Sequence, residues 1–324
     1  MGERQEFGDD ILKKLKALSD KYAAMGQDLS AYLDGLLYAD YLTYWDYINL
    51  DTLLSLQHPI TPFPDESIFI VYHQITELYF KLALHELEQV NTAAPADATA
   101  ILKRVNRVNR YFEALTQSFE IMVDGMEQDQ FLKFRMSLLP ASGFQSAQYR
   151  KIEIRSTTFN RLLNEDHRDP NENYQPGDIE SLYPHIYWKA GAVELASGKK
   201  TLTLRQFEVK YDRDLLELAE NTFEVNLRSL WQALPAAEQT DELKQSLRWL
   251  DVNVNINWPL SHYKSAVRYL QRNPEDIAAT GGTNWQKYLP PRFQKRIFYP
   301  ELWSADELNE WGKGWVEKEV FGRG

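Results

Sequence analysis

The chain has 324 residues and no cysteine, and its 36 Lys and Arg against 47 Asp and Glu give a formal net charge of -11 at pH 7. Without cysteine, it cannot form disulfides, zinc–thiolate sites, iron–sulfur clusters, cysteine nucleophiles or thiolate-ligated haem. The negative charge and the lack of long basic runs argue against nucleic acid or an anionic membrane as a partner. The sequence shows no signal-peptide pattern and no uncharged apolar run of membrane-spanning length, so we expect a cytoplasmic protein.

Most of the chain shows the 3.6-residue apolar period of helices, and Gly and Pro cluster between the periodic segments. This pattern predicts an all-α fold with one helical domain over residues 1–324. The expected helices, in chain order, are 9–26, 28–57, 66–91, 97–125, 127–139, 143–165, 178–195, 212–233, 239–272, 283–289 and 304–319.

Two segments depart from this period. Residues 199–211, KKTLTLRQFEVKY, alternate between polar and apolar, which predicts a short hairpin or an extended loop. Residues 252–257, VNVNIN, alternate as well, but helical pattern flanks them on both sides. Pro259 follows and suits the first turn of a helix, so we expect a helix here with a possible kink.

The six histidines limit the metal chemistry that is open to the chain. A ferritin-like di-iron site needs a Glu three residues before a ligand histidine, and no histidine here has one. A zinc-protease motif fails because Gln89 stands four residues after His85. His58 and His167, like His85, occur among polar or charged residues. No phosphate-binding loop, dinucleotide fingerprint or serine-nucleophile motif is present either.

A haem site remains open, because it needs only one axial histidine on an apolar helix face and room for the macrocycle and oxygen. His185 and His262 are the ligand candidates. His262 has the more suitable face, with Trp258 four residues before it and Ala266 four residues after it. A buried structural histidine is the alternative explanation for His262.

His73 raises the same choice in another helix. It follows Phe69 by one turn, on a face that also carries Thr76 and Phe80. A core histidine bonded to a neighbour is the common explanation for such a position. A functional role for His73 needs partners from elsewhere in the chain.

Six blocks resemble the tryptophan 2,3-dioxygenase family: LTYWDYINLDTLLSLQHP, FIVYHQITELYFKL, FLKFRMSLLPASGFQSAQYRKIE, a late W-x-x-x-H, TGG and FYPEL. They occur in the family's order from about residue 40 to residue 303. The resemblance implies an all-helical homotetramer that binds haem b. It implies addition of both atoms of O2 across the indole C2=C3 bond of L-tryptophan, giving N-formylkynurenine. We also expect residues 1–40 to pack on a neighbouring subunit.

The resemblance assigns roles to five residues around the chemistry. His262 matches the axial ligand of the haem iron, and His73 matches the distal histidine beside the indole N–H. Phe69 matches an aromatic wall of the indole pocket. Arg135 matches the arginine that clamps the substrate carboxylate, and Phe131 lies one turn before it. A guanidinium suits this role, because its planar fork can donate two hydrogen bonds to one carboxylate.

Five further residues are matched at the edges of the site. Thr280 corresponds to the threonine that meets the amino-acid end of the substrate. Ser142 and Gly143 correspond to the small residues at the haem edge. Tyr44 and Tyr47 correspond to aromatics that close the pocket, one of which the family takes from a neighbouring subunit.

The chain departs from the family near the substrate's amino-acid end. Pro259 replaces the basic residue that usually follows the tryptophan of the late helix, and the interval from His262 to Thr280 is longer. TNW replaces the glycine-rich continuation after TGG. Two alternatives therefore stay open: a haem-dependent oxygenase or hydroxylase of another aromatic amino acid, and a haem-binding helical protein without turnover.

Overall fold

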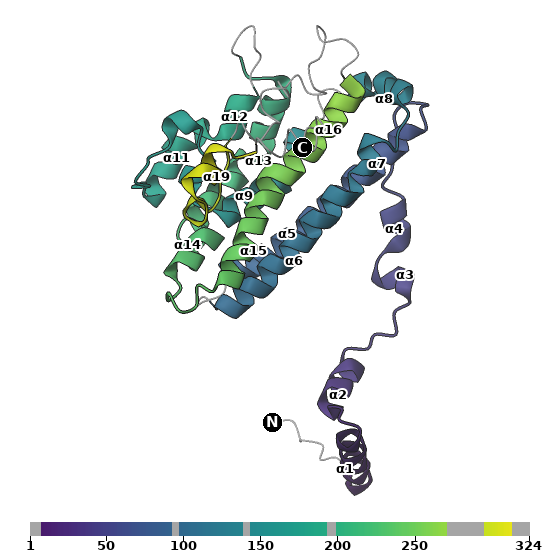
Figure 1. Cartoon of the computed structure of the whole chain (residues 1–324). Coiled ribbons are helices and arrows are strands. Elements are labelled where there is room, and N and C mark those ends of the chain that lie inside the picture. The colour runs from purple at the N-terminus through teal and green to yellow at the C-terminus, as the bar shows by residue number, and fades with distance from the viewer. Residues whose placement is uncertain (1–7, 93–96, 139–142, 193–198, 271–294, 313–324) are drawn as a thin grey trace. The chain divides into compact units, whose positions relative to one another are not determined.

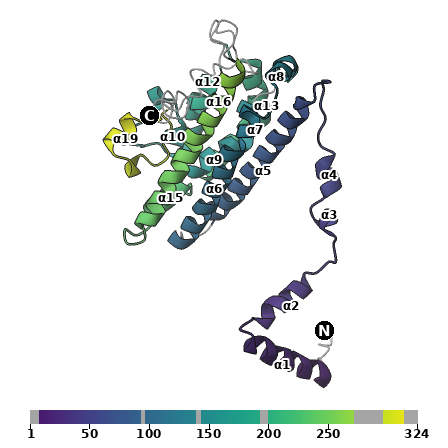
Figure 2. The same cartoon turned by 45° about the vertical axis from the view of Figure 1, so that its right-hand side comes forward.

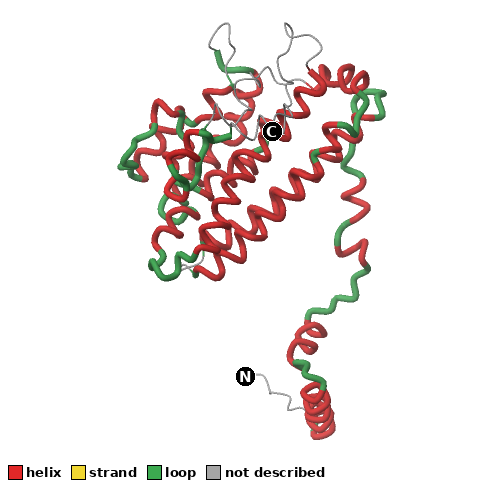
Figure 3. The backbone as a smooth tube through the Cα atoms, viewed as in Figure 1, coloured by secondary structure: helices red, strands yellow, loops and turns green. Residues whose placement is uncertain are grey.

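The structure, a computed structural model, describes residues 8–92, 97–138, 143–192, 199–270 and 295–312. These residues form helices joined by turns and loops, and they contain isolated bridges such as Leu163 with Ile186 but no strand (Figure 3). The prediction of an all-α fold is therefore confirmed. None of the helices in the described ranges is long and apolar enough to cross a membrane.

Two compact units divide the chain, Met1–Gln57 and His58–Gly324. The first holds four helices: α1 (Asp9–Ala24), α2 (Leu29–Leu37), α3 (Tyr44–Tyr47) and α4 (Leu50–Leu54). The expected continuous helix over 28–57 is thus wrong. Tyr41, in the loop after α2, and Asn49, between α3 and α4, take the left-handed conformation, with φ of 54° and 52°, which a right-handed helix cannot contain. The assignment of residues 1–324 to one domain stays a prediction.

The long helices of the second unit lie side by side (Figures 1 and 2). Helix α5 (Asp65–Asn91) packs against α6 (Ala98–Ser118) and α9 (Ala147–Ser156), and α15 (Asp241–Val252) packs against α6. The buried positions of α6 explain this packing, because they recur every three or four residues and form one stripe: Ile101, Val105, Val108, Phe112 and Leu115. Burial of each large apolar side chain contributes about 1.5–3 kcal/mol.

The described part of this unit contains further helices. They are α7 (Glu120–Val123), α8 (Gln128–Phe134), η1 (Arg135–Leu138), η2 (Gly143–Gln145), α10 (Phe159–Leu162), η3 (Glu165–His167), η4 (Pro176–Asp178), α11 (Ile179–Leu182), η5 (Tyr183–His185), α12 (Tyr187–Gly191), α13 (Leu202–Asn221), α14 (Leu227–Ala233), η7 (Pro300–Leu302) and α19 (Ala305–Asn309). The expected helix over 283–289 lies outside the described residues.

Helix α13 corrects the prediction for residues 199–211. The alternating segment is not a hairpin, because Thr201 caps a helix that starts at Leu202, and its hydroxyl accepts a hydrogen bond from the backbone N–H of Leu204 at 3.2 Å. Leu204 and Phe207, three residues apart, are both buried on one face of the helix. The polar and apolar alternation is therefore incidental.

The helix over 241–270 is continuous, as predicted, but its middle is wider. A π-helical turn, η6 (Asn253–Asn257), joins α15 to α16 (Trp258–Leu270). Pro259 explains the wider turn, because it has no N–H and its ring would clash with the carbonyl four residues earlier. The alternating asparagines bond one turn back along the helix: the buried Asn255 donates to the Asp251 carboxylate at 2.7 Å, and Asn257 donates to the side-chain oxygen of Asn253 at 2.9 Å.

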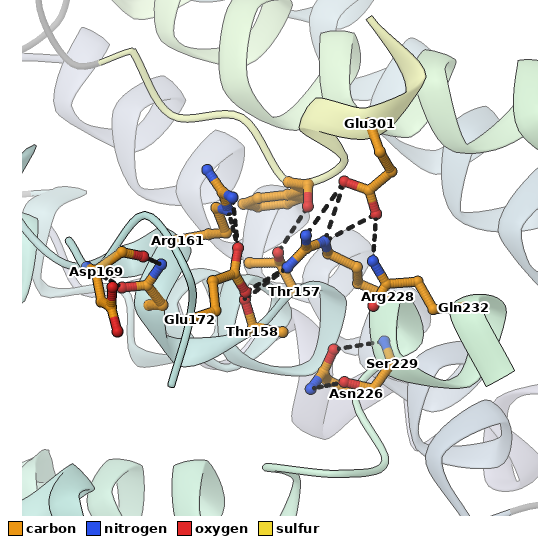
Figure 4. A network of polar contacts seen from close by, with 12 residues as sticks. Thr157, Thr158, Arg161, Asp169, Glu172, Asn226, Arg228, Ser229, Gln232 and Glu301 are labelled. Atoms are coloured by element: carbon orange, nitrogen blue, oxygen red, sulfur yellow. Dashed lines mark hydrogen bonds and ion pairs between the residues drawn. The ribbon is translucent and has the colours of Figure 1, made fainter. Parts of the chain in front are cut away.

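Arg228 of α14 ties three parts of the second unit together (Figure 4). Its Nη1 lies 2.6 Å from a carboxylate oxygen of Glu172, in the loop before η4, and its Nε lies 3.0 Å from Glu301 of η7. Arg161 also donates to Glu172, at 2.6 Å. Burial alone would raise the pKa of Glu172, but Arg228 and Arg161 together hold this pKa below its usual value. Each charge in this network therefore has an opposite charge beside it.

Candidate active site

Helix α5 places Phe69 and His73 one turn apart, and their ring centroids lie 4.1 Å from each other. The side chain of His73 is half-buried. His262, in the first turns of α16, is half-buried as well, and its ring lies 4.5 Å from that of Trp258. Both histidines thus occur one turn after an aromatic residue.

Both histidines form the same local hydrogen bond. Nδ1 of His73 lies 2.7 Å from the Phe69 carbonyl, and Nδ1 of His262 lies 3.1 Å from the Trp258 carbonyl. A carbonyl oxygen can only accept, so Nδ1 carries the proton and Nε2 of the neutral ring keeps a lone pair. Among the described residues, Nε2 of neither histidine forms a hydrogen bond.

Burial keeps both imidazoles neutral. It lowers the pKa of His73 below its ordinary value, although the Phe69 carbonyl and the charge of Glu77 oppose the shift. Burial, with a smaller contribution from the charge of His73, lowers the pKa of His262 to about 4, although the Trp258 carbonyl opposes the shift. The charge of His73 acts on His262 because the two histidines, from separate helices, lie in one region, where Tyr72 and Phe119 join them through ring contacts.

Aromatic side chains from three helices line this region. Phe131 of α8 lies 6.4 Å from Phe69, and Phe134 lies 5.8 Å from it. The ring of Tyr269 of α16 lies 4.7 Å from that of Phe131, tilted by 42°, and so joins α16 to α8. Phe131, Phe134 and Tyr269 are all buried. The surroundings of His73 are therefore apolar and suit an aromatic ligand.

Phe119 and Tyr72 connect the two histidines through ring contacts. Phe119, between α6 and α7, lies 4.5 Å from His262 and 5.7 Å from Tyr72. The Tyr72 ring lies 6.5 Å from that of His73. The sequence analysis selected neither residue. Tyr72 is next to His73 in the chain, but nothing in the local pattern around Phe119 indicates that it contacts His262.

Arg135 supplies a cation beside the aromatic lining. It is the first residue of η1, directly after Phe134, and follows Phe131 by one helical turn. Its side chain is half-buried, and burial lowers its pKa. A guanidinium nevertheless stays charged at physiological pH. An anionic group of a bound ligand would find a positive partner here.

Comparison of the sequence with known proteins gives matches to one family. Residues 36–223 match the family model described as Tryptophan 2,3-dioxygenase. The tryptophan 2,3-dioxygenase of Pseudomonas fluorescens is 29% identical over 273 residues, 83% of this chain and 92% of the relative. That of Ruegeria sp. is 30% identical over 273 residues, 82% and 92% of the two chains. That of Bacillus anthracis is 29% identical over 270 residues, 82% and 91%.

The chain belongs to the tryptophan 2,3-dioxygenase family. This membership confirms the resemblance and the prediction of an enzyme of the tryptophan 2,3-dioxygenase type. Phe69, His73, Phe131 and Arg135 fall within the residues that match the family model, whereas His262 lies beyond them. The geometry around His262 is therefore a separate source of information on its role.

The structure brings together part of the predicted tryptophan 2,3-dioxygenase site. Phe69, His73, Phe131 and His262 share one region. Arg135 follows Phe131 by four residues in the chain. Gly143 is exposed at the start of η2. Tyr44 and Tyr47 belong to the unit Met1–Gln57, where they are 70% and 73% exposed. Ser142 and Thr280 lie outside the described residues.

His185, the second haem-ligand candidate, has different surroundings. Its side chain is exposed, and its ring stacks on that of the exposed His167 at 3.8 Å. An axial histidine of a haem enzyme needs an apolar face that can cover the macrocycle. His262 meets this requirement and His185 does not.

Proposed function

We propose that this protein is a haem-dependent dioxygenase that adds both atoms of O2 across the indole C2=C3 bond of L-tryptophan, giving N-formylkynurenine. One observation carries the proposal. Two neutral histidines, from α5 and α16, each keep an Nε2 lone pair in one ring-lined region. One can bind iron and the other can accept a hydrogen bond.

In this proposal His262 is the axial ligand of haem b. The bond from Nδ1–H to the Trp258 carbonyl sets the tautomer and orients the ring. The low pKa of His262 removes competition between a proton and iron for Nε2. By the resemblance to the family, Ser142 and Gly143 would hold the haem edge. When bound, ferrous haem supplies the activation of O2.

His73 accepts the hydrogen bond of the indole N–H. The Phe69 carbonyl holds the proton on Nδ1, so Nε2 is the acceptor. Phe69 and Phe131 cover the indole and exclude water, so the ring is held against the reacting oxygen in one orientation. The neutral imidazole of His73 therefore orients the substrate.

Arg135 binds the substrate carboxylate, and Thr280 contacts the amino-acid end. An amino acid that enters an apolar region must bring its carboxylate out of water, which is costly unless a cation pairs with it. The half-buried guanidinium one turn after Phe131 is suited to this pairing. Arg135 would then select for a free amino acid over an amine with the same ring.

The enzyme is proposed to work as a cytoplasmic homotetramer in which residues 1–40 pack on a neighbouring subunit. Tyr44 and Tyr47 would help to close a pocket there. The support is the exposure of large apolar side chains in the unit Met1–Gln57: Leu36 is 71% exposed, Leu37 75%, Tyr38 80% and Tyr41 95%. Contiguous apolar exposure of this kind marks an interaction surface.

Product analysis with isotope-labelled O2 tests the proposed reaction. The purified protein should show a Soret band and, after anaerobic reduction, convert L-tryptophan in labelled air to a product that holds both labelled atoms. A product with one labelled oxygen would instead indicate a hydroxylase, and the assay with other aromatic amino acids would identify its substrate. A protein that takes up no haem would overturn the proposal.

A further inference from the structure

We infer that Phe119 is a positioning residue that holds the His262 imidazole in the orientation in which Nδ1 donates to the Trp258 carbonyl and Nε2 is the ligand atom. The inference rests on the proposed function in one respect, since it takes His262 as the iron ligand. Phe119 itself has no polar atom in its side chain and contacts no reacting group.

Phe119, Trp258 and His262 form a cluster of three rings in mutual contact. The His262 centroid lies 4.5 Å from that of Phe119 and 4.5 Å from that of Trp258, at interplanar angles of 48° and 77°. Phe119 and Trp258 lie 5.3 Å apart, nearly perpendicular. Two rings at different inclinations therefore restrict rotation of the imidazole about its Cβ–Cγ bond.

The backbone at Phe119 is well suited to act as a fixed support. The residue ends α6 and precedes α7, so its N–H donates to the Leu115 carbonyl at 3.0 Å and its carbonyl accepts from the Met122 N–H at 2.8 Å. Its side chain is only 5% exposed. The backbone of Phe119 is therefore held at the junction of two helices, and burial of its side chain restricts movement of the ring.

Tyr72 fixes Phe119 from the side of α5. Its ring meets that of Phe119 edge-on, at 5.7 Å and 88°, and its hydroxyl donates to the Leu115 carbonyl at 3.2 Å. The Phe119 ring is thus held between α5 and α16. The same ring that restrains His262 also contacts the helix of His73.

The orientation of His262 matters because its single local bond is weak on its own. A neutral hydrogen bond from an imidazole to a carbonyl at 3.1 Å leaves room for the ring to turn if nothing packs against it. A turned ring loses this bond, and the proton is then free to move to Nε2, which blocks the ligand lone pair. Phe119 keeps the bonded orientation populated.

Imidazole NMR of the full-length, haem-free protein tests this directly. Nitrogen-15-labelled histidine in the wild type should report a protonated Nδ1 and an unprotonated Nε2 for His262. Phe119→Leu should give averaged nitrogen shifts, because both tautomers become populated. Phe112→Leu is the matched control: Phe112 is a buried ring on the same helix that lies 5.9 Å from Phe80 and contacts no histidine.

The haem-loaded protein gives a second readout. In Phe119→Leu we expect the rhombicity of the ferric electron paramagnetic resonance signal to change and haem to dissociate about tenfold faster, the factor expected from loss of one packed ring contact. Phe119→Tyr keeps the ring and should restore both properties. If Phe119→Leu fails to fold, Phe119→Met, which keeps the volume but not the flat ring, replaces it.

The outcomes separate the inference from the proposed function. A wild-type protein without a Soret band would remove the proposed function, while the tautomer comparison in the haem-free protein would still decide the role of Phe119. A single His262 tautomer in Phe119→Leu, or equal changes in Phe119→Leu and Phe112→Leu, would overturn the inference.

Discussion

Two polar regions of the same helical unit differ in whether all the polar atoms of their central side chains have hydrogen-bond partners. Around Glu153, which is fully buried, the carboxylate receives Arg150 at 3.0 Å, the Tyr187 hydroxyl at 2.5 Å and also Arg296. Around His73 and His262, each ring has one hydrogen bond to a carbonyl and an Nε2 without a partner in the described part of the chain.

Asp251 belongs with the first kind of region. Its two carboxylate oxygens accept four hydrogen bonds, from the backbone N–H groups of Phe298 and Tyr299 and from the side chains of Asn255 and Trp303. Burial raises its pKa to about 6, although these donors oppose the shift. Asp251 therefore ties the segment before η7 to the helix that leads into α16.

The difference shows how structural and functional polar groups can be told apart. A buried group whose partners all come from the fold stabilises that fold, and its removal leaves other groups unpaired. A half-buried group with an unused lone pair among aromatic rings adds little to the fold, and a ligand can complete it. Each region should therefore fail a different test when it is altered.

His262→Ala should have the largest effect on activity and a small effect on the fold. The variant has no axial ligand, so it should purify with little haem and show no measurable turnover. Its melting temperature should equal that of haem-free wild type within a few degrees, because the single hydrogen bond of His262 among the described residues is local and its ring is half-buried. The Soret absorbance and a thermal melt measure the two effects. A normal Soret band with turnover would remove His262 from the ligand role.

Glu153→Gln, unlike His262→Ala, should cause a large loss of folding stability. The variant leaves Arg150 and Arg296 buried without their carboxylate, and breaking a buried pair costs about 3–5 kcal/mol. Urea denaturation should show this loss. Glu88→Gln is the control, since Glu88 is 54% exposed beside Arg155 and should contribute less than about 1 kcal/mol. Equal losses for the two variants would contradict the assignment.

Two of the long helical segments could be predicted from the sequence almost to the residue. The predicted 66–91 corresponds to α5, and 239–272 corresponds to the continuous α15, η6 and α16, because both have sustained helical periodicity. Other segments were less predictable. The expected helix over 28–57 breaks at two residues with positive φ, and α13 begins earlier than its alternating pattern indicates. Local backbone choices and caps decide such cases.

The site was predictable only where its residues are neighbours on one helix. The pairing of Phe69 with His73 follows from spacing on α5, and that of Phe131 with Arg135 follows from spacing at the end of α8. The contact of Phe119 with His262 joins residues that are far apart in the chain. No periodicity encodes it, because it depends on how α6, α7 and α16 pack.

Arg135→Ala should weaken the use of tryptophan by thirtyfold or more and leave haem content unchanged. Loss of one partner of a desolvated charge pair costs about 2–5 kcal/mol, which corresponds to this factor or more. The specificity constant kcat/KM for L-tryptophan measures the loss.

Tryptamine is the control ligand for Arg135, because it keeps the indole ring and lacks the carboxylate. It should bind the wild type poorly, and Arg135→Ala should change its affinity far less than that of tryptophan. Equal losses for the two ligands, or no loss for tryptophan, would make Arg135 a structural residue.

His73→Ala should lower turnover by roughly tenfold and not abolish it. In the proposed function His73 accepts one hydrogen bond from a neutral indole N–H, and such a bond contributes about 0.5–1.5 kcal/mol net. Haem content and melting temperature should stay close to wild type, since Nε2 of His73 has no partner among the described residues. Complete loss of turnover with haem still bound would instead make His73 an obligatory proton acceptor.

The smallest expected effect is that of mild acid on kcat/KM, and its sign follows from burial. An unperturbed histidine with a pKa of about 6.5 is half protonated at pH 6.5, which would halve a rate that needs its neutral form. Burial lowers the pKa of His73, so it stays neutral at that pH, and its loss of function begins only as the pH falls further. His262 does not add to this titration once iron occupies Nε2. We therefore expect kcat/KM to change by less than about twofold between pH 8 and pH 6.5 and to decrease at pH values below 6.5. This decrease should be absent in His73→Ala. An inflection at or above pH 6.5 that disappears in His73→Ala would mean that His73 is solvated in the working enzyme, and the distinction between its apolar surroundings and the fully paired Glu153 region would then no longer hold.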